Sequence, residues 1–205
     1  MEKLLKDRKS IYNPFIYVAG EKALAAGLVI IVASAFVGYL NNTWLDGVLD
    51  MHYGPRAPFY WHLFMGLVNW LLLLIILTPL AYTLSRSRIR FVDLAGTLAL
   101  ARFPMLIAII TGFLNAPDRV AQHLMYVYLE VGDPVPVSIF DFIITIIAGT
   151  LVLLMIVWMV ALMYNGYRWS ANLRGTRSGI SFTVGFVVAY VLSKVVIGQM
   201  AGVLL

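Results

Sequence analysis

The chain has 205 residues, of which 61% are hydrophobic and 12% are charged, and its mean hydropathy is +0.88. One soluble core cannot bury so much apolar surface, so the composition indicates an integral membrane protein. The formal net charge is +5. The basic residues flank apolar runs, where they set membrane topology, so we exclude nucleic acid as a partner. The chain has no cysteine, which excludes disulfides, thiol catalysis and thiolate metal sites.

Residues 1–13 form a basic leader, suited to an anionic membrane surface or to a solvated tail, and residues 14–205 are expected to form one membrane domain. Asn13 is a capping residue type and is followed by a proline, so the first helix is predicted to run from Pro14 to Leu40. Its membrane portion is about Ala19 to Tyr39. The next stretch, 41–55, mixes tryptophan, leucine and valine with acids, which is typical of a short interfacial segment.

Four further apolar runs are long enough to cross a bilayer. Between the third and fourth of them, apolar residues repeat at helical spacing from Asn115 to Gly132 and predict an amphipathic surface helix. The sequence therefore predicts an all-α polytopic bundle with five transmembrane helices. The predicted second to fifth spans are Tyr60 to Leu84, Phe91 to Leu114, Val135 to Met163 and Gly179 to Val203.

Basic residues alternate from one side of the predicted spans to the other. The opposite loops hold only Arg56 and Arg119, so the positive-inside rule places the N-terminus in the cytoplasm and Leu205 outside. The basic residues assigned to the cytoplasmic side are Lys3, Lys6, Arg8, Lys9 and Lys22 before the first span, Arg86, Arg88 and Arg90 between spans two and three, and Arg168, Arg174 and Arg177 between spans four and five.

The third predicted span carries an arginine and a proline near its midpoint. Arg102 should lie roughly 15 Å deep, where a charge is costly, so it is expected to be buried in the bundle with a partner. Pro104 cannot donate to the carbonyl of Leu100, and a kink is expected there. Ala95 and Ala99 share the face of Arg102, where small residues favour contact with another helix.

Two further charges fall inside predicted spans, Asp141 in the fourth and Lys194 in the fifth. Both should lie at similar depth, on faces that also carry small residues, so we expect an ion pair between them, with Arg102 and Asn69 near enough to join a polar cluster. One interpretation is a site for an anionic ligand or ion. The other is a structural pair that fixes helix register.

The histidines and most acids fall on the outer side. Asp50, His52, His62 and His123 are residue types that bind divalent metals, but no H-E-x-x-H or comparable spacing is present, and ordinary interfacial residues are the alternative. Asp93 is expected to be a local charge partner of the nearby arginines. No nucleophile motif or glycine-rich phosphate loop is present, so neither enzymatic activity nor a cofactor is predicted.

The turn before the last span combines aromatic residues, amides and arginines between Tyr164 and Ser178. This composition suits a protein partner or lipid head groups, and a loop that only fixes topology is the alternative.

Two segments carry a family resemblance. Gly96-Thr-Leu-Ala-Leu-Ala-Arg-Phe-Pro104 in the third span and Asn172-Leu-Arg-Gly-Thr-Arg177 before the last one resemble the bacterial branch of the Yip1 family. The resemblance covers most of the chain from Asn13 onward and implies a five-helix Yip1 domain in a bacterial cytoplasmic membrane. Eukaryotic relatives act in vesicle traffic, associate with Rab GTPases and with one another, and have no established catalytic activity. We expect this protein to lack the long hydrophilic N-terminal region of those relatives.

The leading hypothesis is a non-enzymatic membrane protein that contacts membrane lipids and self-associates, or binds a cytoplasmic protein partner, in a role that organises membranes or resembles trafficking. The second hypothesis is a small permease, or a lipid- or ion-binding protein, that uses Arg102, Asp141 and Lys194. The third is an outward-facing metal-dependent membrane enzyme.

Overall fold

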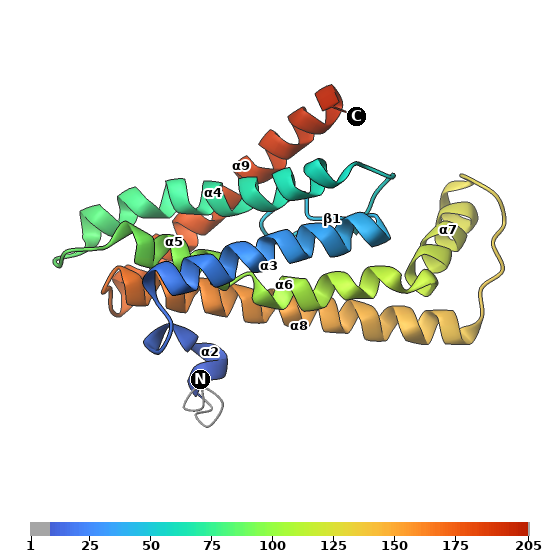
Figure 1. Cartoon of the computed structure of the whole chain (residues 1–205). Helices are drawn as coiled ribbons and strands as arrows, with labels where there is room; N and C mark the ends of the chain where they lie inside the picture. The colour runs from blue at the N-terminus through green and yellow to red at the C-terminus, as the bar shows by residue number, and fades with distance from the viewer. Residues whose placement is uncertain (1–8, 205) are drawn as a thin grey trace.

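The computed structural model describes the backbone of residues 9–204 and the side chains of residues 11–202; residues 1–8 of the basic leader lie outside this range. Most of the described chain is helical (Figure 1), and five helical segments in it are long and apolar enough to cross a membrane. The predicted all-α bundle is confirmed. The element bounds are α2 Lys9–Tyr12, η1 Pro14–Ile16, α3 Gly20–Asn41, β1 Thr43–Trp44, β2 His52–Tyr53, α4 Phe59–Leu84, α5 Phe91–Leu100, α6 Phe103–Ala108, η2 Ile109–Phe113, α7 Asn115–Leu129, α8 Ile139–Ser170 and α9 Thr176–Leu204.

The first long helix starts later than predicted. Asn13 makes no side-chain capping bond, and Pro14 opens only a short 3-10 turn. The backbone is then extended at Ala19, and Gly20 has a φ of +62°, a conformation that glycine adopts without strain. The helix therefore begins at Gly20, and the prediction of a start at Pro14 was wrong.

Helices α3 and α5 pack closely because glycines line their contact. A Cβ atom on Gly27 of α3 would lie 2.5 Å from the backbone nitrogen of Leu100, and one on Gly96 of α5 would lie 2.7 Å from the carbonyl oxygen of Gly20. Ala95 and Ala99 are also buried. The expected small-residue contact on this face of the third span is confirmed, and it brings the two backbones together.

The third span is broken where the proline predicted a kink. Helix α5 ends at Leu100 and α6 begins at Phe103, with Pro104 in the first turn, where its missing N–H costs least. Between them the backbone N–H of Arg102 donates to the carbonyl of Ala99 at 3.2 Å. This short-range bond tightens the chain at the break.

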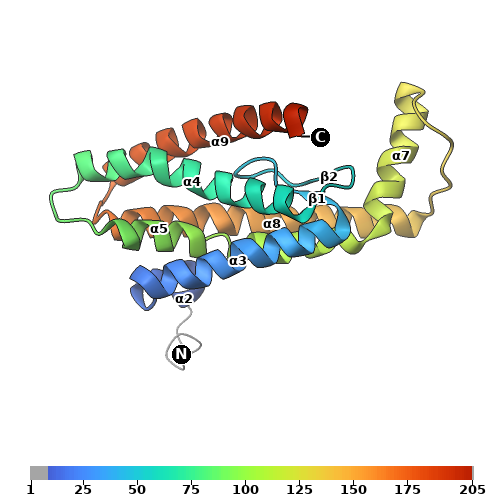
Figure 2. The ribbon, with the colours of Figure 1, turned by 45° about the horizontal axis from the view of Figure 1, so that its top comes forward.

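Helix α8 is shifted relative to its predicted bounds. Ser138 and Asp141 form a reciprocal capping box, which fixes the start at Ile139. At its other end α8 continues to Ser170, so the turn before α9 is shorter than the predicted one. The amphipathic helix α7 is confirmed, and Figure 2 shows it standing away from the bundle beside the start of α8.

Helix α9 lies on α4 and diverges from most of α8 (Figures 1 and 2). A Cβ atom on Gly185 would lie 2.6 Å from a methyl of Leu77. Because residue 185 has no side chain, α4 can pack closely on α9 at this point. By contrast, a Cβ atom on Gly149, Gly198 or Gly202 would have no neighbouring atom of the described residues within 4 Å. The small-residue faces that we expected to bring α8 and α9 together make no such contact.

The chain between α3 and α4, which we call the inserted loop (residues 42–58), enters the bundle. Strands β1 and β2 pair as a short antiparallel hairpin within it. Between them, Leu45 and Val48 are 5% and 0% exposed and join the main hydrophobic core. The amide of Asn69 donates to the carbonyl of Leu45 at 2.7 Å, and Ser193 Oγ accepts from the N–H of Val48 at 3.2 Å. The loop is thus packed against α4 and α9, which the prediction of a short interfacial segment did not include.

Candidate functional site

Lys194 on α9 pairs with the inserted loop instead of with α8. Its Nζ lies 2.6 Å from Asp46 Oδ2 and 3.0 Å from Asp50 Oδ2. His52 Nδ1 lies 3.1 Å from the other oxygen of Asp46, and the hydroxyl of Tyr190 donates to Asp50 at 3.4 Å. The ammonium of Lys194 and the carboxylates of Asp46 and Asp50 thus hold the loop on α9. The expected pair between Lys194 and Asp141 is not formed.

The carboxylate of Asp46 is held in its ionised form. Burial alone would raise its pKa, but hydrogen bonds and charge interactions with His52 and Lys194 outweigh burial and lower the pKa to about 2. Asp46 therefore remains negative across the physiological pH range, and the loop stays attached to Lys194.

Asp141 connects α7 to α8. Its Oδ1 forms an ion pair with Arg119 of α7, and its Oδ2 accepts hydrogen bonds from the backbone and hydroxyl of Ser138, both at 2.8 Å. The carboxylate is therefore occupied by a helix cap and by α7. The expected Asp141 and Lys194 pair fails because each residue finds a closer partner in a connecting segment.

Arg102 is buried as predicted, with 3% of its surface exposed. Its two terminal guanidinium nitrogens have no hydrogen-bond partner among the described residues. The residue follows the C-terminal end of α5, where the helix dipole favours a positive charge. Asn69 donates to the inserted loop. Arg102, Asn69, Asp141 and Lys194 therefore share no hydrogen bond or ion pair with one another and do not form the expected polar cluster.

The candidate metal ligands lie in different surroundings. His52 contacts Asp46, His62 is buried on α4 with 3% exposed, and His123 on α7 bonds to the carbonyl of Val135 at 3.1 Å. Asp50 is paired with Lys194. Within residues 9–204, the structure brings no three metal-binding side chains together.

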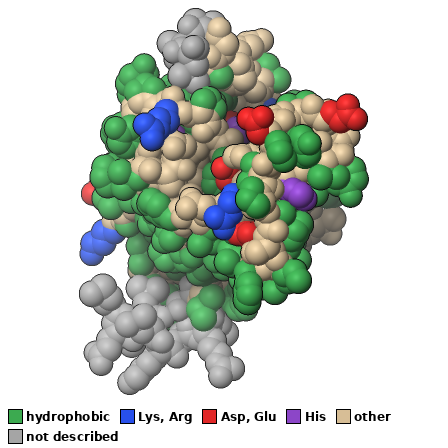
Figure 3. All heavy atoms as spheres, turned by 90° about the vertical axis from the view of Figure 1, so that its right-hand side faces the viewer, with side chains coloured by type: hydrophobic (Ala, Val, Ile, Leu, Met, Phe, Trp, Pro, Cys, Tyr) green, Lys and Arg blue, Asp and Glu red, His purple; other side chains and the backbone are tan. Residues whose placement is uncertain are grey.

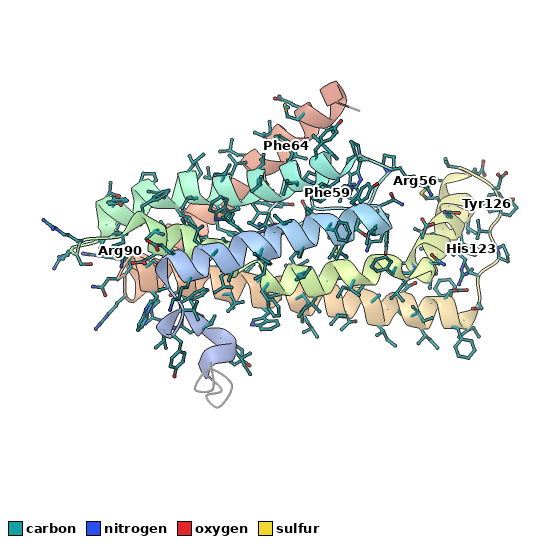
Figure 4. The ribbon with its side chains drawn as sticks, viewed as in Figure 1. Arg56, Phe59, Phe64, Arg90, His123 and Tyr126 are labelled. Carbon is teal, nitrogen blue, oxygen red and sulfur yellow. The ribbon has the colours of Figure 1, made fainter. Side chains whose placement is uncertain are left out.

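The arginines predicted to be cytoplasmic gather at one end of the bundle. Figure 4 places Arg90 at this end, opposite Arg56 and His123. Arg90 lies 4.0 Å from Asp93, in agreement with the expected local pair. Figure 3, which views the opposite end, shows carboxylates and histidine among hydrophobic side chains. We call the end formed by Arg86, Arg88, Arg90, Arg168, Arg174 and Arg177 the arginine-rich end.

Two adjoining hollows open at the arginine-rich end. The first, which we call the basic hollow, has a volume of about 230 Å³ and is lined by Asn13, Asn165, Arg168, Trp169, Asn172, Leu173 and Arg174. The second has a volume of about 480 Å³ and is lined by Leu84, Arg86, Ser87, Asn172, Leu173, Arg174 and Arg177. The four arginines of these linings are exposed, and no carboxylate among the described residues lies within ion-pair distance of them.

The chain before α3 crosses α8 next to the basic hollow. We call residues 9–18 the N-terminal strap. Trp158 Nε1 donates to the carbonyl of Ile11 and Asn165 Nδ2 donates to that of Tyr12, both at 2.9 Å. An apolar groove of about 310 Å³ lies between the strap and α8, lined by Ile11, Tyr12, Leu154, Met155, Val157, Trp158 and Ala161.

Sequence reasoning missed the acids and amides that complete these sites. Asp46 was not singled out from the sequence, although the apolar residues Leu45 and Val48 near it are three positions apart, a spacing that indicates one buried side of the segment. Asn13 was assigned to a helix cap, and instead it lines the basic hollow. Neither Trp158 nor Asn165 carried any sequence signal for holding the strap.

No family model matches the chain, and no curated protein or solved structure is similar to it. The assignment of its fold and of its class as a membrane protein therefore rests on its own sequence and structure. The chain is an integral membrane protein with a helical bundle built from five long apolar helical segments.

Proposed function

We propose that this chain is a non-enzymatic membrane protein of the Yip1 type, which self-associates or binds a cytoplasmic partner through its arginine-rich end. The observation that carries the proposal is the gathering of Arg86, Arg168, Arg174 and Arg177 around two adjoining hollows without a carboxylate partner among the described residues. Unpaired arginines at a concave surface are suited to acidic groups of a ligand or partner.

The charges within the bundle support the same proposal. Lys194 is neutralised by two carboxylates of the inserted loop, and Asp141 by Arg119. Paired charges that fasten a loop and a surface helix have a structural use, and they leave fewer groups for a transported substrate.

We further propose the orientation that the loop charges favour, with the arginine-rich end in the cytoplasm of a bacterium. Because the natural chain has no cysteine, single-cysteine variants report sidedness cleanly. In intact cells, an impermeant maleimide should label Asp133→Cys, and it should label Arg88→Cys only after permeabilisation. The reverse pattern would overturn the orientation.

Partner binding is tested with a photo-crosslinking amino acid. Placed at Asn172, between the two hollows, it should give a protein adduct in native membranes, whereas the same probe at Glu130 after α7 should not. Changing Arg174 and Arg177 to glutamine should reduce the Asn172 adduct. If Asn172 yields no protein adduct, the proposed partner binding is wrong.

A small permease, or a lipid- or ion-binding protein, is the second candidate, and Arg102 is the observation that favours it. Its two buried terminal nitrogens have no partner among the described residues, as expected for a site that awaits an anion. Arg102→Met should abolish the uptake or binding of an anion if this candidate is right. Unchanged partner crosslinking in the same variant would favour the first proposal.

A further inference from the structure

The basic hollow and the apolar groove lie along one stripe of α8. Residues 154, 157, 158 and 161 of the groove and residues 165, 168 and 169 of the hollow fall at steps of one, three and four that keep them on one face of α8, and Asn172 follows the end of the helix. The N-terminal strap crosses between the two sites, since Tyr12 lines the groove and Asn13 lines the hollow. An apolar site and a cationic site are thus neighbours on a membrane helix.

We propose that this stripe binds one anionic phospholipid, with its phosphate at Arg168, Arg174 and Asn172 and one acyl chain in the apolar groove. This inference rests on the proposed function, because it names a ligand for the same arginine-rich end. Guanidinium groups bind phosphate oxygens through paired hydrogen bonds, and the side-chain amide of Asn172 can add another donor.

The dimensions of the stripe fit one lipid leaflet. From Leu154 to Arg168 the helix rises about 21 Å, at 1.5 Å for each of the residues between them. Half of a bilayer is about 15 Å of hydrocarbon plus roughly 6 Å of head-group region. A lipid whose phosphate lies at Arg168 is therefore long enough to pass over the N-terminal strap and place an acyl chain in the groove.

The apolar groove is the reason for choosing a lipid over an acidic peptide or free phosphate. Its lining is almost wholly apolar, and Val157 and Leu154 are 60% and 57% exposed, as expected for side chains in contact with acyl chains. Trp169, which is 53% exposed at the hollow, is a residue type that favours the head-group level. Asn13 lines this region and its Oδ1 has no hydrogen-bond partner among the described residues, so a hydroxyl-bearing head group such as that of phosphatidylglycerol can donate to it.

The test uses the full-length protein in detergent with equal amounts of phosphatidylglycerol and phosphatidylcholine of identical acyl chains, and counts retained lipids by native mass spectrometry. The natural chain should retain phosphatidylglycerol preferentially. Arg168→Gln combined with Arg174→Gln should reduce that preference at least about tenfold, which is the smallest effect expected when a single hydrogen bond to a charged group is lost. Arg88→Gln combined with Arg90→Gln removes the same charge from the same end, outside both hollows, and should leave the preference intact. An equal loss in this control would overturn the site.

The groove has its own matched pair of variants. Val157→Trp fills it, whereas Val187→Trp makes the same change at an exposed position of α9. Only Val157→Trp should reduce the number of retained lipids. Equal retention in both variants, or displacement of the lipid by millimolar inorganic phosphate or by an acidic peptide, would overturn the lipid assignment. Protein adducts at Asn172 are a separate readout, so failure of the lipid site is distinguishable from failure of the proposed function.

Discussion

The ammonium of Lys194 lies 2.6 Å from a carboxylate oxygen of Asp46, although the two residues are 148 positions apart. This contact joins the last helix to the inserted loop, and Asp50 adds a second carboxylate at 3.0 Å. The pair therefore explains how the inserted loop is held against membrane helices, and what neutralises the lysine in α9.

Lys194→Met should loosen the inserted loop. The change leaves the partly buried carboxylates of Asp46 and Asp50 without their cation, and we expect a loss of about 1–3 kcal/mol, below that of a fully buried pair because the lysine is partly exposed. Thermal unfolding in detergent measures the effect. Lys22→Met, at an exposed position of α3, should change little, and Asp46→Asn with Asp50→Asn should restore part of the stability of Lys194→Met. Equal melting temperatures for Lys194→Met and Lys22→Met would contradict the structural role.

The Asp46 pair also predicts an acid dependence. The pKa of Asp46 is lowered to about 2 in the folded protein, below its ordinary value of about 3.9 in an unfolded chain. Its contribution to stability is therefore fully present above about pH 4 and is lost as the pH falls toward 2. The melting temperature of the natural chain should exceed that of Asp46→Asn at pH 6, and the difference should shrink between pH 4 and 2. A difference that is constant with pH would refute this assignment.

Gly27→Val should destabilise the contact between α3 and α5. A side chain at Gly27 meets the backbone of Leu100, and such overpacking costs about 1–3 kcal/mol. Gly198→Val provides the matched control, because a Cβ there has open space around it, and it should stay within about 0.5 kcal/mol of the natural chain. Greater destabilisation by Gly198→Val would mean that α9 packs more closely than the structure shows.

Arg102 predicts a contrast between two substitutions. Arg102→Met keeps most of the volume and removes a buried charge, so its stability should equal or exceed that of the natural chain. Arg102→Ala leaves a cavity and should cost about 2–4 kcal/mol. Denaturation curves of the two variants decide the matter, and strong destabilisation by Arg102→Met would show that the guanidinium has a partner outside the described residues.

Local patterns predicted most of the fold. The five apolar runs, the amphipathic helix α7 and the break near Pro104 follow from hydropathy, periodicity and proline chemistry, all of which act over a few residues. The first helix was extended too far because Pro14 begins a short 3-10 turn, and only the backbone at Gly20 reveals the true start.

The site was harder to predict because its contacts depend on which helices are neighbours. Depth along two spans suggested that Asp141 faces Lys194, but α9 packs on α4, and the connecting segments supply Arg119 and Asp46 as nearer partners. Depth constrains a charge in one dimension only. The arginines of the arginine-rich end could be grouped from the sequence by their loops, whereas its hollows required the path of the N-terminal strap.

The most direct test of the inserted loop is a disulfide between it and α9. The N–H of Val48 lies 3.2 Å from Ser193 Oγ, and since the natural chain has no cysteine, Val48→Cys with Ser193→Cys introduces only two thiols. In oxidised membranes this variant should form an intramolecular disulfide, detected by mass spectrometry after proteolysis, whereas Val48→Cys with Val187→Cys should not. If no disulfide forms and Val48→Cys reacts freely with a water-soluble maleimide, the loop lies outside the bundle and Lys194 has another partner.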